Sequence, residues 1–360
     1  MTSHPRLRRI ALAAAVIIVA FAGGGCATRP VVVPDASVVT RPAAHAALRS
    51  VMIDRALEDR ILALDPEQVT ADDVRDTLAH GPAPRIILLH GGIYPVYLMM
   101  ESAGRFLAGM GYPENRIRHP GDGRWSHSPY EDSAQIAGFI AWHYERDGMR
   151  PMMIGHSQGG IQAVKVLHEL AGRFDHLIPV WNPLADAPED RTSIVDPLTG
   201  AERPVVGLTV SYVSVVGAGG AALLLPNQWS MVGRLRTIPD AVDEFTGFAI
   251  GLDLLAWTLP GDTEAINFHR EGNTLVRGVM LPAWYNHVFV PDTDALAAHA
   301  ATRNWIDAYR AADAGLAVPP ENAGNGVLWA ADVWHGVKKH WAIEAQRLIR
   351  ARRAVADRLK

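Results

Sequence analysis

Residues 155–159, Gly-His-Ser-Gln-Gly, place one serine between glycines where two sequence patterns meet. The apolar run 151–154 is typical of a buried strand, and residues 159–170 have the spacing of an amphipathic helix. A sharp turn between strand and helix forces its central residue into a sparsely populated backbone conformation, which only small neighbours permit. The pattern therefore predicts that Ser157 is a nucleophile on a strained turn.

A serine hydroxyl is a poor nucleophile until a base accepts its proton, so this chemistry also requires a histidine and an acid that orients it. At the start of a helix, free N–H groups can stabilise an oxyanion. We expect His156, inside the motif, to point away from Ser157 and to serve packing. The alternative for Ser157 is a small polar residue in a bend with no chemical role.

The elements around this turn alternate between strand and helix from residue 85 onward. Short apolar strands are expected at 85–92 and 150–155, and a brief strand with a loop at 115–123. Amphipathic helices are expected at 96–112, 131–147 and 158–173. This alternation predicts an α/β fold, doubly wound around a mostly parallel sheet.

The regular pattern lapses after residue 182. Segment 183–245 is rich in proline and glycine and is expected to be an insertion on the sheet. Strands are expected to resume at 245–253 and 274–282, followed by a helix at 294–311. We predict a globular domain over 45–312, beginning with one or two helices, and a C-terminal helical extension over 313–360.

Two of these motifs together resemble a known superfamily. Residues 88–92 (LLHGG) and 155–160 (GHSQGG), about 65 residues apart, resemble the α/β-hydrolases, especially the lipase-like and esterase-like members. The resemblance covers roughly residues 84–311. It implies that the insertion is a cap or lid after the sixth strand. It also implies that the N–H groups of Gly92 and Gln158 form the oxyanion hole.

The same resemblance implies the order serine, acid, histidine along the chain. In this superfamily the base lies between the last strand and the last helix. His287 occupies that place, between strand 274–282 and helix 294–311. His335 is the rival, because residues 326–336 could form a strand that leads into the final helix.

The acid is expected at the end of the strand before the one that leads to the histidine. Strand 245–253 delivers Asp253 to that position, 34 residues before His287. Asp240, Asp243 and Asp262 flank the same strand and remain alternatives. Asp292 would be the natural acid if His335 were the base.

Residues 217–222 (GAGGAA) follow an apolar strand and match the G-x-G-x-x-A fingerprint of dinucleotide-binding proteins, with Asp240 near the position of a ribose contact. That fingerprint requires a helix to begin at the glycines, and Pro226 interrupts one within two turns. We therefore expect no cofactor. The alternatives for this segment are an apolar lid or pocket wall, with Trp229, and a buried strand end. No His, Cys and acid spacing predicts a metal site.

The N-terminus has the features of an export signal. Three arginines precede the apolar run 10–22, which is too short for a membrane span, so residues 1–25 are predicted to be a signal peptide; an uncleaved anchor is the alternative. Cys26 is the only cysteine in the chain. Its place resembles the lipidated cysteine of bacterial lipoproteins, although Gly23 stands where leucine is usual. Residues 26–44 are then a proline-rich tether.

Without residues 1–25 the chain has 31 Lys and Arg against 38 Asp and Glu, which does not suggest nucleic acid as a partner. The basic stretch 347–360 is expected to be either a solvated helix or a helix resting on an anionic membrane surface. In lipoproteins of this kind, sorting between membranes depends on the residue after the cysteine. By resemblance to that rule, Ala27 rather than Asp implies the outer membrane, facing the periplasm. The sequence does not indicate an oligomeric state.

The expected function is that of a serine hydrolase that cleaves carboxylic esters, either small molecules or lipids, through Ser157, His287 and Asp253. An acyltransferase would use the same residues, with an alcohol in place of water. The third possibility is a binding protein of the cell envelope that keeps the fold without catalysis.

Overall fold

The computed structural model describes residues 48, 53–313, 318–321 and 323–358. The predicted signal peptide, Cys26 and the tether lie outside these residues. None of the helices in the described part of the chain is both long and apolar enough to cross a membrane.

The protein is an α/β structure built around a six-stranded sheet. Every neighbouring pair of strands in this sheet is parallel, in the order β12-β10-β8-β3-β1-β2. The strands are β1 (Ile86–Leu89), β2 (Ser126–His127), β3 (Met152–His156), β8 (Val210–Val216), β10 (Val242–Ile250) and β12 (Leu275–Leu281). The residues of β1, β3 and β8 are buried throughout, as continuous apolar runs predict for a sheet covered on both faces.

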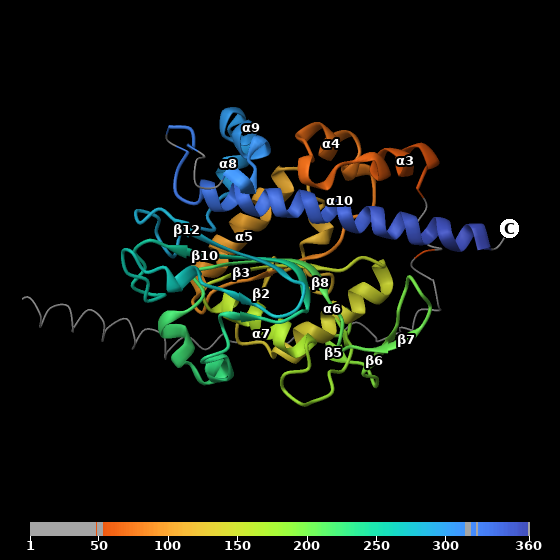
Figure 1. Cartoon of the computed structure of the whole chain (residues 1–360), viewed down its shortest axis with the longest axis horizontal. Helices are drawn as coiled ribbons and strands as arrows, with labels where there is room; N and C mark the ends of the chain where they lie inside the picture. The colour runs from red at the N-terminus through yellow and green to blue at the C-terminus, as the bar shows by residue number, and fades with distance from the viewer. Residues whose placement is uncertain (1–47, 49–52, 314–317, 322, 359–360) are drawn as a thin grey trace, which may run out of the picture.

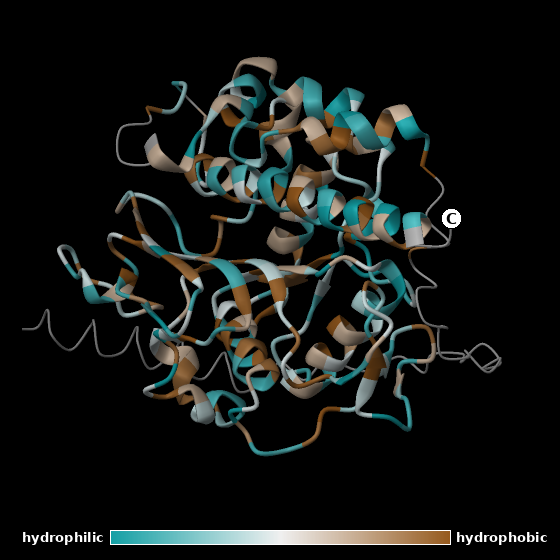
Figure 2. Cartoon of the chain, turned by 45° about the vertical axis from the view of Figure 1, so that its right-hand side comes forward, coloured by the Kyte–Doolittle hydropathy of each residue, from teal (hydrophilic) through white to brown (hydrophobic). Residues whose placement is uncertain are grey.

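Helices cover both faces of this sheet (Figure 1). One face carries α5 (Tyr94–Gly109), α8 (Asp294–Ala298), α9 (Ala300–Ala308) and α10 (Val327–Arg358). The other face carries α6 (Ser133–Asp147) and α7 (Gln158–Leu170). The sheet is therefore doubly wound, and hydrophobic residues run along its central strands (Figure 2).

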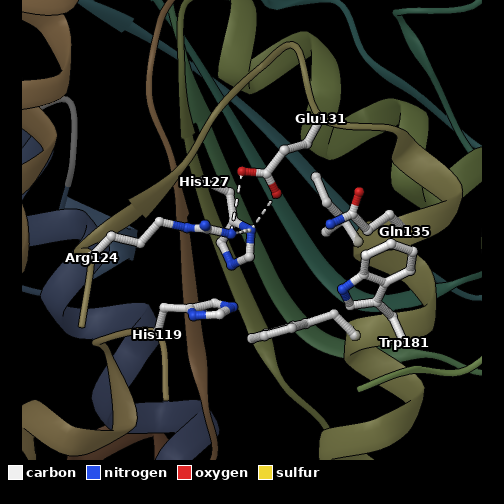
Figure 3. A pocket seen from close by; sticks show the side chains of 8 residues that line it. His119, Arg124, His127, Glu131, Gln135 and Trp181 are labelled. Carbon is white, nitrogen blue, oxygen red and sulfur yellow. Dashed lines mark hydrogen bonds and ion pairs between the residues drawn. The ribbon is translucent and has the colours of Figure 1, made fainter. Parts of the chain in front are cut away.

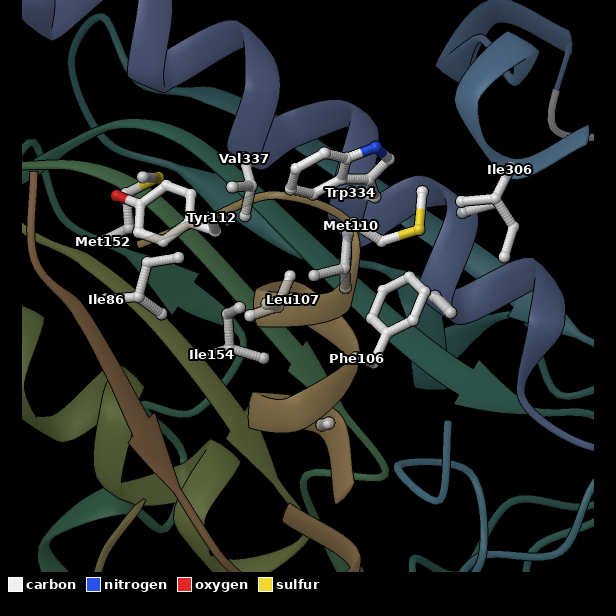
Figure 4. Packing of buried hydrophobic residues seen from close by; sticks show 14 of the residues in the cluster. Ile86, Phe106, Leu107, Met110, Tyr112, Met152, Ile154, Ile306, Trp334 and Val337 are labelled. Carbon is white, nitrogen blue, oxygen red and sulfur yellow. The ribbon is translucent and has the colours of Figure 1, made fainter. Parts of the chain in front are cut away.

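The larger hydrophobic core lies between the sheet and α10. Figure 4 shows Trp334 of α10 above Ile154 of β3, with Phe106 of α5 to one side, and all three side chains are buried. A second core lies between the sheet and helices α6 and α7, and includes Ile140 and Val164. Burying such side chains stabilises the fold by about 1.5–3 kcal/mol each, before entropy is subtracted.

The N-terminal part packs on α10. It contains α3 (Arg55–Ala63), η1 (Pro66–Gln68), α4 (Ala71–Asp76) and η2 (Leu78–His80). Thr70 and Asp73 form a reciprocal capping box at the start of α4. Glu58, fully buried on α3, forms ion pairs with Arg352 and Arg353 near the end of α10. Part of the basic stretch 347–360 is thus paired with acidic side chains of the same chain.

The remaining elements are short. Short strands of two or three residues form three two-stranded sheets: β4 (Trp181–Asn182) with β5 (Ala187–Pro188), β6 (Ser193–Val195) with β7 (Glu202–Pro204), and β9 (Thr237–Ile238) with β11 (His269–Arg270). The short 3₁₀ helices are η3 (Glu114–Arg116), η4 (Gly220–Leu224), η5 (Pro226–Met231), η6 (Glu264–Ile266) and η7 (Ala311–Asp313).

Several expectations about elements are corrected. Segment 183–245, expected to be an insertion, contributes β8 to the middle of the sheet, because its apolar run 208–216 pairs with β3 on one side and β10 on the other. Residues 115–123 form η3 and a loop, and the strand of this region is β2. The helix expected at 294–311 is broken at His299, which ends α8 and precedes α9.

Candidate active site

The candidate site lies at one edge of the sheet, at the point where the order in which the chain adds strands changes direction. From β1 the chain moves outward to β2, then returns to the other side of β1 with β3 and continues through β8, β10 and β12. In open α/β sheets the carboxyl ends of strands at such a switch point form a crevice. Ser157 follows β3 and Gly92 follows β1, so both lie at this edge.

Ser157 occupies the turn between β3 and α7 in a strained conformation. Its φ of 56° and ψ of −124° are rarely adopted by a residue with a side chain. Its N–H donates to the carbonyl of Val216 at 2.8 Å, so the end of β8 holds the turn. The strain raises the serine out of the strand and leaves it partly exposed at the helix start.

The glycines on either side of Ser157 are required by close backbone contacts. A Cβ on Gly155 would lie 2.7 Å from the carbonyl oxygen of Gly159. A Cβ on Gly159 would lie 2.3 Å from the carbonyl oxygen of Leu89, at the end of β1. The glycine spacing in the sequence therefore reflects the close approach of α7 to two strands.

His287 lies in the loop after β12 and contacts the serine. Its Nε2 is 2.9 Å from Oγ of Ser157, and its Nδ1 is 2.6 Å from Oδ2 of Asp253. A carboxylate only accepts hydrogen bonds, so Nδ1 carries a proton and Nε2 can accept the serine proton. The structure thus brings together Ser157, His287 and Asp253, which are 130 and 34 residues apart along the chain.

Asp253 is held by its own loop after β10. Its Oδ1 accepts hydrogen bonds from the N–H groups of Leu255 and Ala256, each at 3.0 Å, and its backbone pairs with Thr258 in both directions. Burial alone would raise the pKa of Asp253, but the hydrogen bond from His287 and the two N–H groups lower it below its ordinary value. The carboxylate is therefore ionised when it faces the imidazole.

The alternative acids have other partners. Asp243 forms an ion pair with Arg150, Asp240 accepts from Thr274, and Asp262 caps the turn at Glu264. Asp292 is exposed. His335, the rival base, lies inside α10 rather than after a strand.

The two residues expected to form an oxyanion hole are neighbours. Gln158 is the first residue of α7, where N–H groups have no acceptor within the helix. A Cβ on Gly92 would lie 2.2 Å from Oε1 of Gln158, so the loop after β1 touches this side chain. Tyr130 donates its hydroxyl hydrogen to the carbonyl of Gly92 at 3.2 Å.

The loop that carries Tyr130 is pinned by a polar pocket beside β2 (Figure 3). Glu131 binds Nδ1 of His127 at 2.7 Å and lies 3.4 Å from the guanidinium of Arg124. Burial would raise the pKa of Glu131, but His127 and Arg124 outweigh it and lower the pKa to about 2. These contacts hold Glu131 next to Tyr130, so the pocket supports the loop beside Gly92.

Two residues of the site were not predicted in these roles. His156 is fully buried, and its Nε2 lies 2.7 Å from the backbone carbonyl of His287. It points away from the serine as expected, but it contacts the loop after β12 at His287 instead of serving packing alone. The only sequence signal was its place beside Ser157, which does not reveal a partner 131 residues away.

Gly217 is the second residue whose role in the site was not predicted. It follows the last residue of β8 with a φ of +64°, and a Cβ there would lie 2.8 Å from Cε1 and 2.9 Å from Nδ1 of His287. It belongs to the GAGGAA segment, whose last three residues begin the short 3₁₀ helix η4 rather than the α-helix that a dinucleotide site needs. The segment is thus the wall against which the histidine packs.

Within residues 48, 53–313, 318–321 and 323–358, no group of three or more His, Cys, Asp or Glu side chains is placed to hold a metal ion. No protein-family model matches the sequence, and a search of curated proteins found no match. Among solved structures, one described as "RedJ with PEG molecule bound in the active site" is similar to 62% of this chain and 89% of its own, at 17% identity and a TM-score of 0.31. At that TM-score the similarity supports no conclusion about activity.

Proposed function

We propose that the protein is a serine hydrolase of the α/β-hydrolase type that cleaves carboxylic esters. The observation that carries the proposal is the unbroken chain of contacts from Oγ of Ser157 through the imidazole of His287 to the carboxylate of Asp253, at 2.9 and 2.6 Å. The strained turn at Ser157, on the carboxyl edge of a doubly wound sheet, supports the same proposal.

In the proposed mechanism, His287 takes the serine proton as Oγ attacks the ester carbonyl. Asp253 keeps the proton of Nδ1 in place and stabilises the imidazolium that forms. The N–H groups of Gly92 and Gln158 are the proposed donors to the oxyanion, and removing one such donor typically slows catalysis by about 10²–10³-fold.

Collapse of this intermediate breaks the carbon–oxygen bond to the alcohol, which leaves with the proton from His287. The acyl group is then bound to Oγ of Ser157. A water gives a proton to His287 and attacks the acyl carbonyl. The acid is released and the serine regains its proton.

The remaining expectations stay part of this proposal. The segment with η4 and η5, which borders His287, is the proposed cover of the site. Residues 1–25 and Cys26 are the proposed signal peptide and lipid anchor, which would place the enzyme in the cell envelope.

The proposal is tested by labelling the purified full-length protein with a fluorophosphonate probe, which reacts with activated serines. We expect wild type to be labelled and Ser157→Ala to remain unlabelled. Ser193→Ala is the matched control, because Ser193 is partly exposed, as Ser157 is, but lies on β6, where its hydroxyl donates to Glu202 at 2.6 Å. Absence of label on folded wild-type protein would remove the proposal.

A further inference from the structure

Large apolar side chains are exposed on the loops that surround Ser157. We name six of them the apolar rim: Tyr94, Leu224, Trp229, Leu254, Trp257 and Trp284. Each is more than half exposed, from 56% for Trp257 to 73% for Leu254. They lie in the segments that follow β1, β8, β10 and β12, which are parallel to β3, so all lie at the same edge of the sheet as Ser157.

The loops that carry the apolar rim have almost no charge. Residues 90–100, 217–233, 251–261 and 282–291 contain a single Asp, Glu, Lys or Arg, which is Asp253, whereas 20% of the whole chain is charged. Asp253 is itself buried against His287. Isolated exposed apolar residues are normal on a protein surface, but their concentration on uncharged loops around one site marks a binding surface.

Trp257 is further support for a surface that displays apolar groups. Its φ of +59° is unusual for a bulky side chain, and the side chain is nevertheless 56% exposed. Folding therefore accepts strain in the Asp253 loop without burying the tryptophan. Tryptophan and tyrosine, three and one of the six rim residues, favour boundaries between water and an apolar phase.

We infer that the apolar rim docks on the surface of an uncharged apolar phase, an aggregate of neutral lipid esters, and that the substrate reaches Ser157 from this phase. The inference rests on the proposed function. A protein partner or a second copy bound to the apolar rim would block access of substrate to Ser157. An ester phase would instead cover the exposed apolar side chains and supply the substrate at the same place. The lack of Lys and Arg in the four loops disfavours an anionic membrane surface.

The test places a polarity-sensitive fluorophore on the full-length chain at one engineered cysteine. The background carries Cys26→Ser, which removes the native cysteine, and Ser157→Ala, which prevents hydrolysis. Leu224→Cys and Leu254→Cys place the fluorophore on two different rim loops. Leu177→Cys is the matched control: Leu177 is 74% exposed, but it follows the C-terminal end of α7, at the opposite edge of the sheet.

On addition of trioctanoylglycerol droplets, we expect a blue shift of the emission at positions 224 and 254 and none at 177. The shift should persist when salt shortens the Debye length from about 10 Å to about 3 Å, because docking involves no charge. A control position that shifts equally, or rim positions that do not shift, would overturn the inference. So would a shift without droplets that grows with protein concentration, which would identify a second copy as the occupant.

A second measurement uses active protein without a fluorophore. We expect Leu224→Ser to lower the rate on trioctanoylglycerol droplets several-fold more than the rate on a dissolved short-chain ester, and Leu177→Ser to lower neither. Equal losses on both substrates for Leu224→Ser would contradict the inference. The fluorescence experiment reads contact with the phase, so its failure is distinct from a failure of Ser157 to react with the fluorophosphonate probe.

Discussion

Nε2 of the buried His156 lies 2.7 Å from the backbone carbonyl of His287, and this contact joins the strand before the serine to the loop that carries the imidazole. A carbonyl oxygen only accepts, so His156 donates the Nε2 hydrogen. Burial lowers the pKa of His156 to about 3, which keeps the ring neutral. The contact fixes the backbone from which the His287 side chain reaches Ser157.

His156 should therefore act as a positioning residue. His156→Leu removes the donor and should lower kcat by about 10²-fold with little change in KM, since it affects the alignment of His287 and not the binding of ester. His156→Gln keeps an N–H at a similar place and should recover most of the activity. Steady-state kinetics on a dissolved p-nitrophenyl ester would check this, and equal losses in both variants would contradict it.

The same residue predicts a pH dependence of stability. The folded pKa of His156, about 3, lies below the ordinary value of 6.5, so between these values the unfolded chain binds more protons. Stability must then rise with pH across this window, by up to about 1.4 kcal/mol per pH unit from this residue. Urea unfolding from about pH 4 to pH 6 should give a shallower rise for His156→Gln than for wild type. Parallel curves would show that His156 does not titrate in this way.

The two histidines that the sequence left as rivals should behave differently. His287→Ala removes the base and should lower kcat by on the order of 10⁶-fold. His335→Ala changes a buried residue of α10 that does not follow a strand, and it should alter stability with kcat unchanged. Kinetics on the folded variants provide the comparison; a similar loss for His335→Ala would remove the assigned role of His287.

Kinetics on variants also distinguish the candidates for the acid that orients His287. Asp253→Asn keeps the shape of the side chain, but its amide can donate to Nδ1 of His287. The ring proton then stands on Nε2, which cannot accept the proton of Ser157, and kcat should fall by about 10⁴-fold. Asp292→Asn is the matched control, because Asp292 is exposed and only five residues after His287. We expect it to retain wild-type kinetics. Loss of activity in this control would return the choice of acid to the alternatives.

Local pattern was sufficient for some of these residues and not for others. Ser157 could be predicted because strand, glycines and helix are adjacent in the chain, and His287 because it follows a strand pattern and precedes a helix. Asp253 was one of several aspartates, since no local signal distinguishes a carboxylate that turns toward a histidine 34 residues away. The contact of His156 with His287 depends on how β3 and the loop after β12 meet in space.

Local pattern was also insufficient to predict where the expected insertion begins and ends. Segment 183–245 has many prolines and glycines around the apolar run 208–216, and the strand pattern of that run does not show which other strands it will pair with. β8 becomes a central strand because it pairs with β3 and β10, and neither pairing is encoded within the segment. Gly217 gains its importance only from this placement, which brings the end of β8 against the imidazole.

Gly217 supplies the most specific test of the site geometry. In Gly217→Ala the new Cβ would lie 2.8 Å from Cε1 of His287, so the ring must move away from Ser157. We expect kcat to fall by about 10²-fold, in addition to a stability cost of about 1 kcal/mol for alanine at positive φ.

Gly207→Ala separates these two effects. Gly207 also has a positive φ, +94°, but a Cβ there meets no atom within 4 Å. It should lose a similar free energy of unfolding and keep wild-type kcat. Urea unfolding and ester kinetics on both variants make the comparison. If the two variants lose activity equally, alanine at positive φ and not contact with His287 is the cause.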